Sequence, residues 1–241
     1  MKTDGFTKKG AMHTDHNEDA FYMKQISDRW FIAAVMDGCS SGVDSHFASA
    51  LYAKIIRKVC KTLPQIELMQ VSSGVGEFSV QTIGELILSQ LYEESKSMQK
   101  IFMAEVIEML STVILAVYNM ERKELWINSS GDGLFEVNGN ITVIDQNNMP
   151  DFMAYHYKSS YQEWINNHTQ THEFNNVESF SISTDGVQKF FKPKSKEFEV
   201  VDMKERVLGT NVMLSELLEQ LKEKEYLVPF DDFTVVNVSN P

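Results

Sequence analysis

The sequence has only two cysteines, Cys39 and Cys60, and no Cys-x-x-Cys motif. This count excludes a disulfide framework and favours a reducing compartment. No apolar run approaches the roughly 20 residues that a membrane-spanning helix needs. The polar residues 1–10 also lack the apolar segment of a signal peptide. We therefore expect a cytoplasmic protein with no membrane partner.

Basic residues are also scarce. The 22 lysines and arginines are outnumbered by 34 aspartates and glutamates, which gives a formal net charge of −12. Binding to a phosphate backbone needs a basic surface, so we expect no nucleic-acid partner. An acidic protein suits cations instead, or a substrate that is reached through a bound cation.

The chain shows neither an internal repeat nor a linker. With 241 residues and a hydrophobic fraction of 43%, it is long enough for a sizeable core, and we expect a single domain over residues 1–241. Residues 145–177 differ from the rest because they are rich in Asn, Tyr and His and only weakly periodic. They predict a flap-like insertion on the surface with little core of its own.

Apolar periodicity predicts two long helices early in the chain, over residues 40–61 and 79–97, and one late, from 203 or 210 to 225. Residues 98–109 fit a helix or a strand, and residues 72–76 indicate a loop that does not match a phosphate-binding loop. Strands are predicted at 30–36, 111–118, 124–128, 134–137, 141–144, 178–184 and 231–238, and another begins at Phe21. Apolar helix faces must be buried, so a two-sheet sandwich covered by helices satisfies the pattern.

The most informative stretch is residues 31–38, an apolar run that ends abruptly on Asp37 and Gly38. It predicts a buried strand that places the Asp37 carboxylate at the mouth of a site, followed by a glycine that permits a sharp turn. Other acids occupy similar positions at the ends of predicted strands: Asp19, Asp185, Asp231 and Asp232. Several strands that each deliver a carboxylate at one end suggest a site for a hard cation.

Two histidine pairs have spacings that metal ligands can also have: His13 with His16, and His168 with His172. For the first pair, two histidines in a polar segment is the favoured explanation, because no cysteine or third histidine is near. The second pair could share a helix face, but such pairs also occur by chance in polar segments.

Five short motifs carry a resemblance to a known family. In order, they are Asn17-Glu18-Asp19-Ala20, Val35-Met36-Asp37-Gly38, Gly131-Asp132-Gly133, Ser183-Thr184-Asp185-Gly186 and Asp231-Asp232-Phe233-Thr234. Their order and spacing resemble those of the metal-dependent protein phosphatases, the PPM or type 2C family, from about residue 5 to residue 238. Each motif alone could be a turn or a cap, as most Asp-Gly pairs are. Acids that cluster near a core without partners are costly, however, and this favours the ordered set as a site.

The resemblance implies an α+β fold, a four-layer α-β-β-α sandwich of two antiparallel sheets flanked by helices. It implies two Mn²⁺ or Mg²⁺ ions in a cleft between the sheets, with a weaker third ion in some members. The implied activity is hydrolysis of phosphoserine or phosphothreonine on proteins, by a hydroxide that bridges two ions about 4 Å apart. The implied partners are a phosphorylated protein substrate and, as a candidate, a cognate Ser/Thr kinase.

Carried over by position, the resemblance assigns a role to each acid. Asp37 would bridge both ions, the Gly38 carbonyl and Asp19 would hold one of them, and Asp185 and Asp231 would hold the other. Carboxylates and carbonyls are the ligands that Mg²⁺ and Mn²⁺ prefer. Two further acids complete the set: Asp132, which matches a ligand of the third ion shared with Asp185, and Glu18, which would act through waters. The catalytic candidates are Asp37, Asp185 and Glu18.

The sequence also departs from the family pattern. Thr14 stands where an arginine usually clamps the substrate phosphate, and His13 is a candidate substitute, as are Lys8 and Lys9. Cys39 replaces a histidine that many eukaryotic members have. The pair Asp231-Asp232 replaces Asp-Asn, and the flap lacks an Asp-His-Ser motif. These departures suggest a divergent bacterial-type branch, and they leave two alternatives open: a catalytically weak regulator that binds a phosphoprotein or kinase, and a small-molecule phosphatase.

Overall fold

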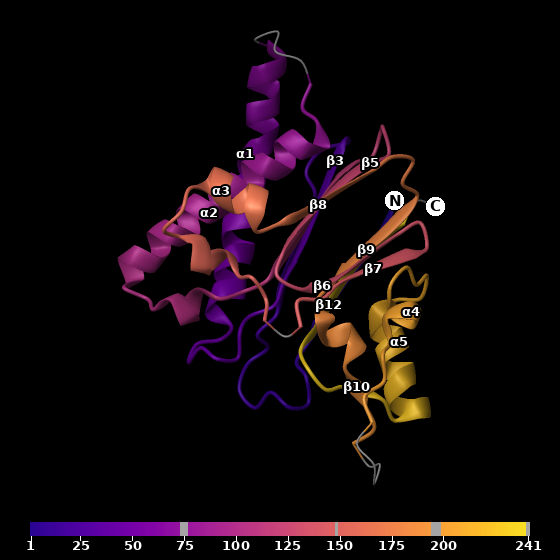
Figure 1. The fold of residues 1–241 in the computed structure, drawn as a ribbon. Coiled ribbons are helices and arrows are strands. Elements are labelled where there is room, and N and C mark those ends of the chain that lie inside the picture. Colours follow the sequence, from indigo (N-terminus) through magenta and orange to yellow (C-terminus); the bar gives the residue numbers. More distant parts are fainter. Residues whose placement is uncertain (73–76, 148, 194–198, 240–241) are drawn as a thin grey trace.

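The structure is a computed structural model that describes residues 1–72, 77–147, 149–193 and 199–239. Two five-stranded antiparallel sheets face each other, and helices cover the outer face of each sheet (Figure 1). Helices α1, α2 and α3 lie on one side of the sandwich, and α4 and α5 lie on the other. This α-β-β-α arrangement confirms the predicted fold class.

The two sheets mix strands from distant parts of the chain. The first has the order β2 (Ala20–Gln25), β3 (Trp30–Met36), β4 (Val113–Asn119), β5 (Glu124–Ser130) and β8 (Gln170–Phe174). The second has the order β1 (Lys2–Lys8), β12 (Phe233–Ser239), β9 (Ser179–Ser183), β6 (Gly133–Val137) and β7 (Asn140–Ile144). A separate short ribbon pairs β10 (Phe190–Phe191) with β11 (Val228–Pro229).

The helices are α1 (Phe47–Ser72), α2 (Val80–Phe102), α3 (Tyr161–Asn167), α4 (Lys204–Val207) and α5 (Leu214–Gln220). Short 3₁₀ turns are η1 (Val106–Met109), η2 (Met153–His156) and η3 (Asp185–Gln188), and η4 (Leu221–Glu225) is a π-helical turn. Within the described residues, none of the helices combines the length and apolar character needed to cross a membrane.

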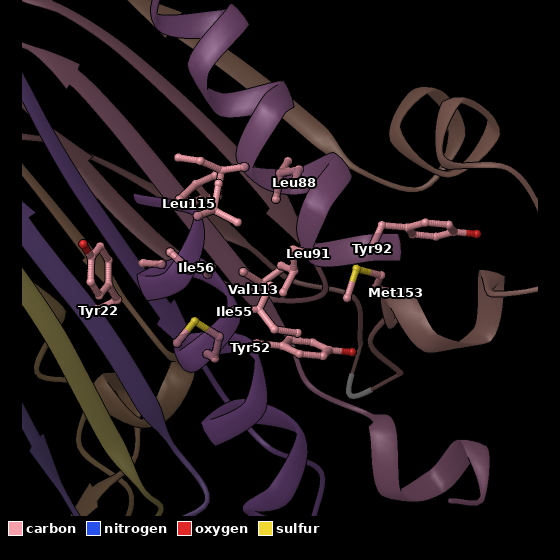
Figure 2. Close-up of a cluster of buried hydrophobic side chains, with 14 of the residues drawn as sticks. Tyr22, Tyr52, Ile55, Ile56, Leu88, Leu91, Tyr92, Val113, Leu115 and Met153 are labelled. Carbon is pink, nitrogen blue, oxygen red and sulfur yellow. The ribbon is translucent and has the colours of Figure 1, made fainter. Parts of the chain in front are cut away.

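Alternation along β3 explains why this strand lies between two cores. Trp30, Ile32, Ala34 and Met36 point toward α1 and α2, whereas the three residues between them, Phe31, Ala33 and Val35, point into the space between the sheets. Successive strand residues face opposite sides, so an uninterrupted apolar run indicates a strand that is buried on both faces. Figure 2 shows the helix-side core, in which side chains of α1 and α2 meet those of β4.

A third core lies under α4 and α5 on the second sheet. The leucine stripe of the last predicted helix is buried there against Phe233 and Val235 of β12. This helix is not continuous, however, because the chain forms α4, then α5, and then the π-helical turn η4. The C-cap Tyr226 has a φ of 58°, in the left-handed region that ends helices.

The first helix begins later than predicted, at Phe47, and continues through Pro64 to Ser72. The Glu108 carboxylate binds the backbone amides of Val43 and Asp44 at 2.8 and 2.9 Å, which holds the preceding residues in a turn. Helix α2 begins where predicted, with Ser79 as its N-cap, and continues to Phe102. Residues 98–102 are therefore helical, and residues 73–76 of the predicted loop lie outside the described residues.

Residues 145–177, predicted as a flap-like insertion with little core of its own, pack into the helix-side core that α1 and α2 form. This segment forms β8 at the edge of the first sheet and contributes Met153 and Trp164, both fully buried, to the helix-side core. Trp164 stacks on Tyr92 of α2 with ring centroids 5.3 Å apart, and Met153 lies beside Tyr92 in Figure 2. Large aromatic side chains give the segment its buried area, although it lacks a regular period.

The sequence analysis also missed β1. Its residues are polar or half-exposed, which hides the strand period, and β1 pairs along its whole length with β12. An edge strand needs only one apolar face, so its pattern in the sequence is weak.

Candidate metal centre

Four acids meet because of how neighbouring antiparallel strands are connected. Asp19 precedes β2 and Asp37 follows β3. These strands pair antiparallel, so both acids lie at the same ends of the two strands in the first sheet. In the second sheet, β9 and β12 also pair antiparallel. Asp185 follows β9 and Asp231 precedes β12, so these two acids likewise lie at neighbouring strand ends. The two sets of strand ends come together, because the hydroxyl of Thr184, next to Asp185, donates to Asp19 Oδ2 at 2.8 Å.

Crowding of these carboxyl groups changes their protonation. Burial, followed by the charges of Asp19, Asp185 and Asp231, raises the pKa of Asp37 well above its usual range. Burial also raises the pKa of Asp19 to about 7, although hydrogen bonds with Thr234 and Thr184 oppose the shift. A site that discourages ionised carboxylates in this way is one in which a bound cation is strongly favoured.

One oxygen of Asp19 shows directly why a bound cation is favoured at this site. Asp19 Oδ2 accepts a hydrogen bond of 2.8 Å from the Thr184 hydroxyl, whereas the buried Oδ1 has no hydrogen-bond partner among the described residues. A buried carboxylate oxygen without a donor is costly, and a cation ligated there would remove the cost.

The backbone at Gly38 leaves no room for a side chain. A Cβ at this position would lie 2.2 Å from the Ser45 carbonyl oxygen and 2.8 Å from that of Glu18. The Gly38 amide donates to the Glu18 carbonyl at 3.1 Å. The Asp37 amide donates to the Thr112 hydroxyl at 3.1 Å, and the Asp37 carbonyl accepts from the Thr112 amide at 2.8 Å. The strand end that carries Asp37 is therefore rigid and closely packed.

Lys189 occupies the side of the site that the second sheet provides. Its ammonium lies 2.7 Å from Asp185 Oδ2 and 2.7 Å from Asp231 Oδ2. Burial raises the pKa of Asp231. Lys189 and the 2.8 Å hydrogen bond with His13 Nε2 act in the opposite direction, and the net result is a lowered pKa. The ammonium thus stands where the sequence predicts a divalent cation. The sequence analysis missed Lys189, although its position four residues after Asp185 at a helical turn could have indicated the ion pair.

Asp132 lies on the turn where the chain passes from the first sheet to the second, between β5 and β6. Gly131 and Gly133 on either side have φ angles of +85° and +147°, which only glycine adopts readily. Burial and the nearby charge of Asp185 raise the pKa of Asp132 to about 6. The structure thus places Asp132 close enough to Asp185 for their charges to interact.

Glu18 and Asp232 hold the loop that precedes β2. The Glu18 carboxylate accepts hydrogen bonds from the hydroxyls of Ser40 and Ser45 at 2.7 and 2.6 Å. Asp232 accepts from the backbone amides of Gly10, at 2.7 Å, and Glu18. This second acid of the Asp231-Asp232 pair is buried and anchors the loop through backbone amides.

His13 and Thr14 line an open groove of about 370 Å³ beside the acids, together with Glu18, Ser40 and Ser45. His13 Nδ1 lies 3.3 Å from Glu18 Oε1. Thr14 is exposed, and its hydroxyl donates to the adjacent Asp15 at 3.2 Å. His13, which lies 2.8 Å from Asp231 Oδ1, links this groove to the four acids.

The histidine pairs suggested by spacing behave differently in the structure. His13 contacts the acids, whereas His16 packs on His46 with ring centroids 4.2 Å apart. His168 and His172 do not share a helix face, because α3 ends at Asn167 and β8 begins at Gln170. His172 lies against Phe135 between the sheets, and burial lowers its pKa.

The donors that converge here fit Mn²⁺ or Mg²⁺. The four acids offer carboxylate oxygens, which hard divalent cations prefer as ligands, and the His13 imidazole lies beside them, 2.8 Å from Asp231 Oδ1. The buried, unpartnered Oδ1 of Asp19 and the cationic Lys189 between two of the acids both indicate that the centre requires positive charge.

Comparison with protein families defines the class. The model of the family described as protein phosphatase 2C matches residues 10–222, most of the chain. The chain belongs to the protein phosphatase 2C family. A search of curated proteins found no match.

Solved structures agree on the fold. A point mutant of a bacterial serine phosphatase superposes with a TM-score of 0.66 at 15% identity, covering 100% of this chain and 99% of that one. RsbX in complex with magnesium gives a TM-score of 0.57 at 17% identity, with 98% and 92% covered. PppA, a regulatory component of T6SS in Pseudomonas aeruginosa, gives 0.60 at 15% identity, with 99% and 97% covered.

Proposed function

We propose that this chain is a Mn²⁺- or Mg²⁺-dependent protein serine/threonine phosphatase, formed as a single domain over residues 1–241. The observation that carries the proposal is the convergence of four acids from strand ends of the two sheets: Asp19, Asp37, Asp185 and Asp231. One buried oxygen of Asp19 also has no hydrogen-bond donor among the described residues. Membership of the protein phosphatase 2C family supports it, as does the magnesium bound to the similar RsbX.

Each acid has a role in this proposal. Asp37, Asp19 and the Gly38 carbonyl would hold a metal ion on the side of the first sheet. Asp185 and Asp231 would hold the ion on the side of the second sheet. Asp132, close to Asp185, would contribute to a third. When bound, the ions would acidify a water molecule for attack on phosphorus and neutralise charge on the phosphate.

The protein's own side chains would position the substrate. The groove beside the acids contains the His13 imidazole and the Thr14 hydroxyl, which would donate to a phosphate by exchanging their present acceptors, Asp231 and Asp15. Glu18 fixes the groove wall through Ser40 and Ser45, and this positions any water that lies between it and the centre. The substrate in this proposal is a phosphorylated protein, with a cognate Ser/Thr kinase as a candidate partner. The net charge of −12 disfavours nucleic acid.

A second candidate is a catalytically weak regulator that binds a phosphoprotein or a kinase. Two observations favour it. Lys189 already neutralises Asp185 and Asp231, and Thr14 stands where the family usually has the phosphate-clamping arginine.

Phosphate release from a phosphothreonine peptide separates the two candidates. The full chain should be assayed with Mn²⁺, with and without a chelator, while fluorescence anisotropy measures binding of the same peptide. Turnover that the chelator abolishes supports the phosphatase. Peptide binding without turnover would support the regulator instead.

A further inference from the structure

A second cluster of metal-ligating side chains lies in the segment between β7 and β8. His156 Nε2 lies 2.6 Å from Asp151 Oδ1, and His168 Nδ1 lies 2.8 Å from Asp151 Oδ2. The ligand atoms of all three residues lie within 4.8 Å of one another. None of the three belongs to the motifs of the metal centre described above.

The backbone holds these three residues in place. The Asp151 amide donates to Gln146 Oε1 at 2.5 Å, and its carbonyl accepts from the Ser130 hydroxyl at 3.1 Å. The His156 carbonyl accepts from the Tyr92 hydroxyl at 2.5 Å, and the His168 amide donates to the carbonyl of the fully buried Trp164 at 2.9 Å. Each ligand is thus attached to an ordered part of the fold, which reduces the cost of assembling a site.

The two imidazoles lie close together. Their rings stack with centroids 3.6 Å apart and an interplanar angle of 24°. Neutral imidazole is the form that ligates a metal ion. With no ion bound, each ring donates one N–H to Asp151. With an ion bound, each ring would carry its proton on its other nitrogen.

Exposure leaves room for further ligands. The side chains of Asp151, His156 and His168 are 37%, 16% and 31% exposed. Two imidazole nitrogens and one carboxylate, with open positions for water, suit borderline ions such as Zn²⁺ and Co²⁺ better than Mg²⁺. This donor set, with two imidazoles and one carboxylate, therefore differs in chemistry from the four carboxylates of Asp19, Asp37, Asp185 and Asp231.

We propose that Asp151, His156 and His168 bind one divalent transition-metal ion of the Zn²⁺ class. The ion would tie the residues before η2 to the junction between α3 and β8. Through the Ser130–Asp151 hydrogen bond, the site connects to the turn that carries Asp132, since Ser130 directly precedes Gly131. The proposal goes beyond the proposed function and does not depend on phosphatase activity.

Cobalt titration of the full chain tests the proposal. Excess Mg²⁺ would compete for the four acids of the metal centre, and Co²⁺ bound to imidazole would be followed by visible absorption. Co²⁺ held by another group that contains a histidine, His13 with Glu18 and Asp232, would not be lost when His156 or His168 is replaced. We expect one Co²⁺ per chain, displaced by Zn²⁺. Affinity should fall at least about tenfold in His156→Gln and in His168→Gln, because each loses one ligand. His16→Gln, which removes another histidine outside the cluster, should bind Co²⁺ as the wild type does.

Nitrogen NMR of the wild-type protein avoids any concern about misfolded variants. On addition of Zn²⁺, the signals of His156 Nε2 and His168 Nδ1 should shift as coordinated nitrogens do, and those of His16 should not. Absence of imidazole-bound Co²⁺ in the wild type would overturn the proposal. Unchanged affinity in the two variants, or Zn²⁺ shifts at other nitrogens only, would overturn it as well.

Discussion

The ammonium of Lys189 lies 2.7 Å from Asp231 Oδ2, and it makes the same short contact with Asp185. A cation that belongs to the chain thus neutralises two carboxylates proposed to hold a metal ion. The ion pair relieves the repulsion between the acids, but it must open for a divalent ion to bind to both.

Lys189→Met therefore tests competition between the ammonium and the metal. Without the ammonium, the metal no longer competes with Lys189 for Asp185 and Asp231, so we expect Mn²⁺ affinity to rise several-fold and the metal-free protein to lose stability. Mn²⁺ binding can be followed by electron paramagnetic resonance. Lys58→Met, which removes a surface lysine paired with Glu94 on the helix side, is the control. Weaker Mn²⁺ binding in Lys189→Met would mean that the lysine organises the centre instead.

The raised pKa values predict that metal affinity depends on pH. Asp19 has a pKa of about 7 and Asp132 of about 6, so without metal both hold protons that an ionised ligand must lose. Mn²⁺ affinity should therefore rise at least about tenfold between about pH 5.5 and 7.5, because binding releases these protons. Calorimetric titration across this range measures it, and an affinity independent of pH would contradict the account.

The same shifts predict how the metal-free protein responds to pH. Each raised carboxyl pKa means that the folded state holds a proton that the unfolded chain, with a pKa near 3.8, has lost. Below pH 3.8, these groups therefore make a contribution to the free energy of unfolding that does not change with pH. Their contribution decreases as the pH rises from 3.8 to about 7. Added Mn²⁺ should stabilise the protein most at the upper end of this window, as thermal unfolding with and without Mn²⁺ would show.

Trp164→Ala tests whether residues 145–177 belong to the core. Trp164 is fully buried and stacks on Tyr92, so its truncation should lower the free energy of unfolding by about 3–5 kcal/mol. Met149→Ala, at a position 78% exposed in the same segment, should change it by less than about 0.5 kcal/mol. Urea unfolding measures both variants, and equal effects would indicate a segment that does not pack as described.

Much of the fold could be predicted from local pattern. The apolar run of β3 and the leucine stripe at residues 214–221 are visible in the sequence as buried surfaces. The sequence analysis predicted the β3 strand and the leucine-lined helix face from them. By contrast, β1 and β8 are edge strands with polar sequences, and their pairing with β12 and β5 depends on the fold as a whole. Trp164 was missed as a core residue because a lone aromatic has no period.

The acids of the site could be predicted for a similar reason, since a carboxylate at the end of an apolar strand is a local signal. Their partners could not. Lys189 reaches Asp231 across 42 residues of sequence, and His13 reaches it across 218. The Asp151–His168 contact likewise forms only when η2 and α3 have packed on α2.

Turnover in Asp37→Asn is the most direct test of the central claim. Asparagine keeps the shape of the side chain but removes the charge of a carboxylate proposed to hold the metal. Wild-type protein with Mn²⁺ should release phosphate from a phosphothreonine peptide. In Asp37→Asn, both turnover and Mn²⁺ binding should fall by at least about a hundredfold, while circular dichroism confirms the fold. If Asp37→Asn hydrolyses the peptide at the wild-type rate, or if the wild type shows no Mn²⁺-dependent hydrolysis, the account is contradicted.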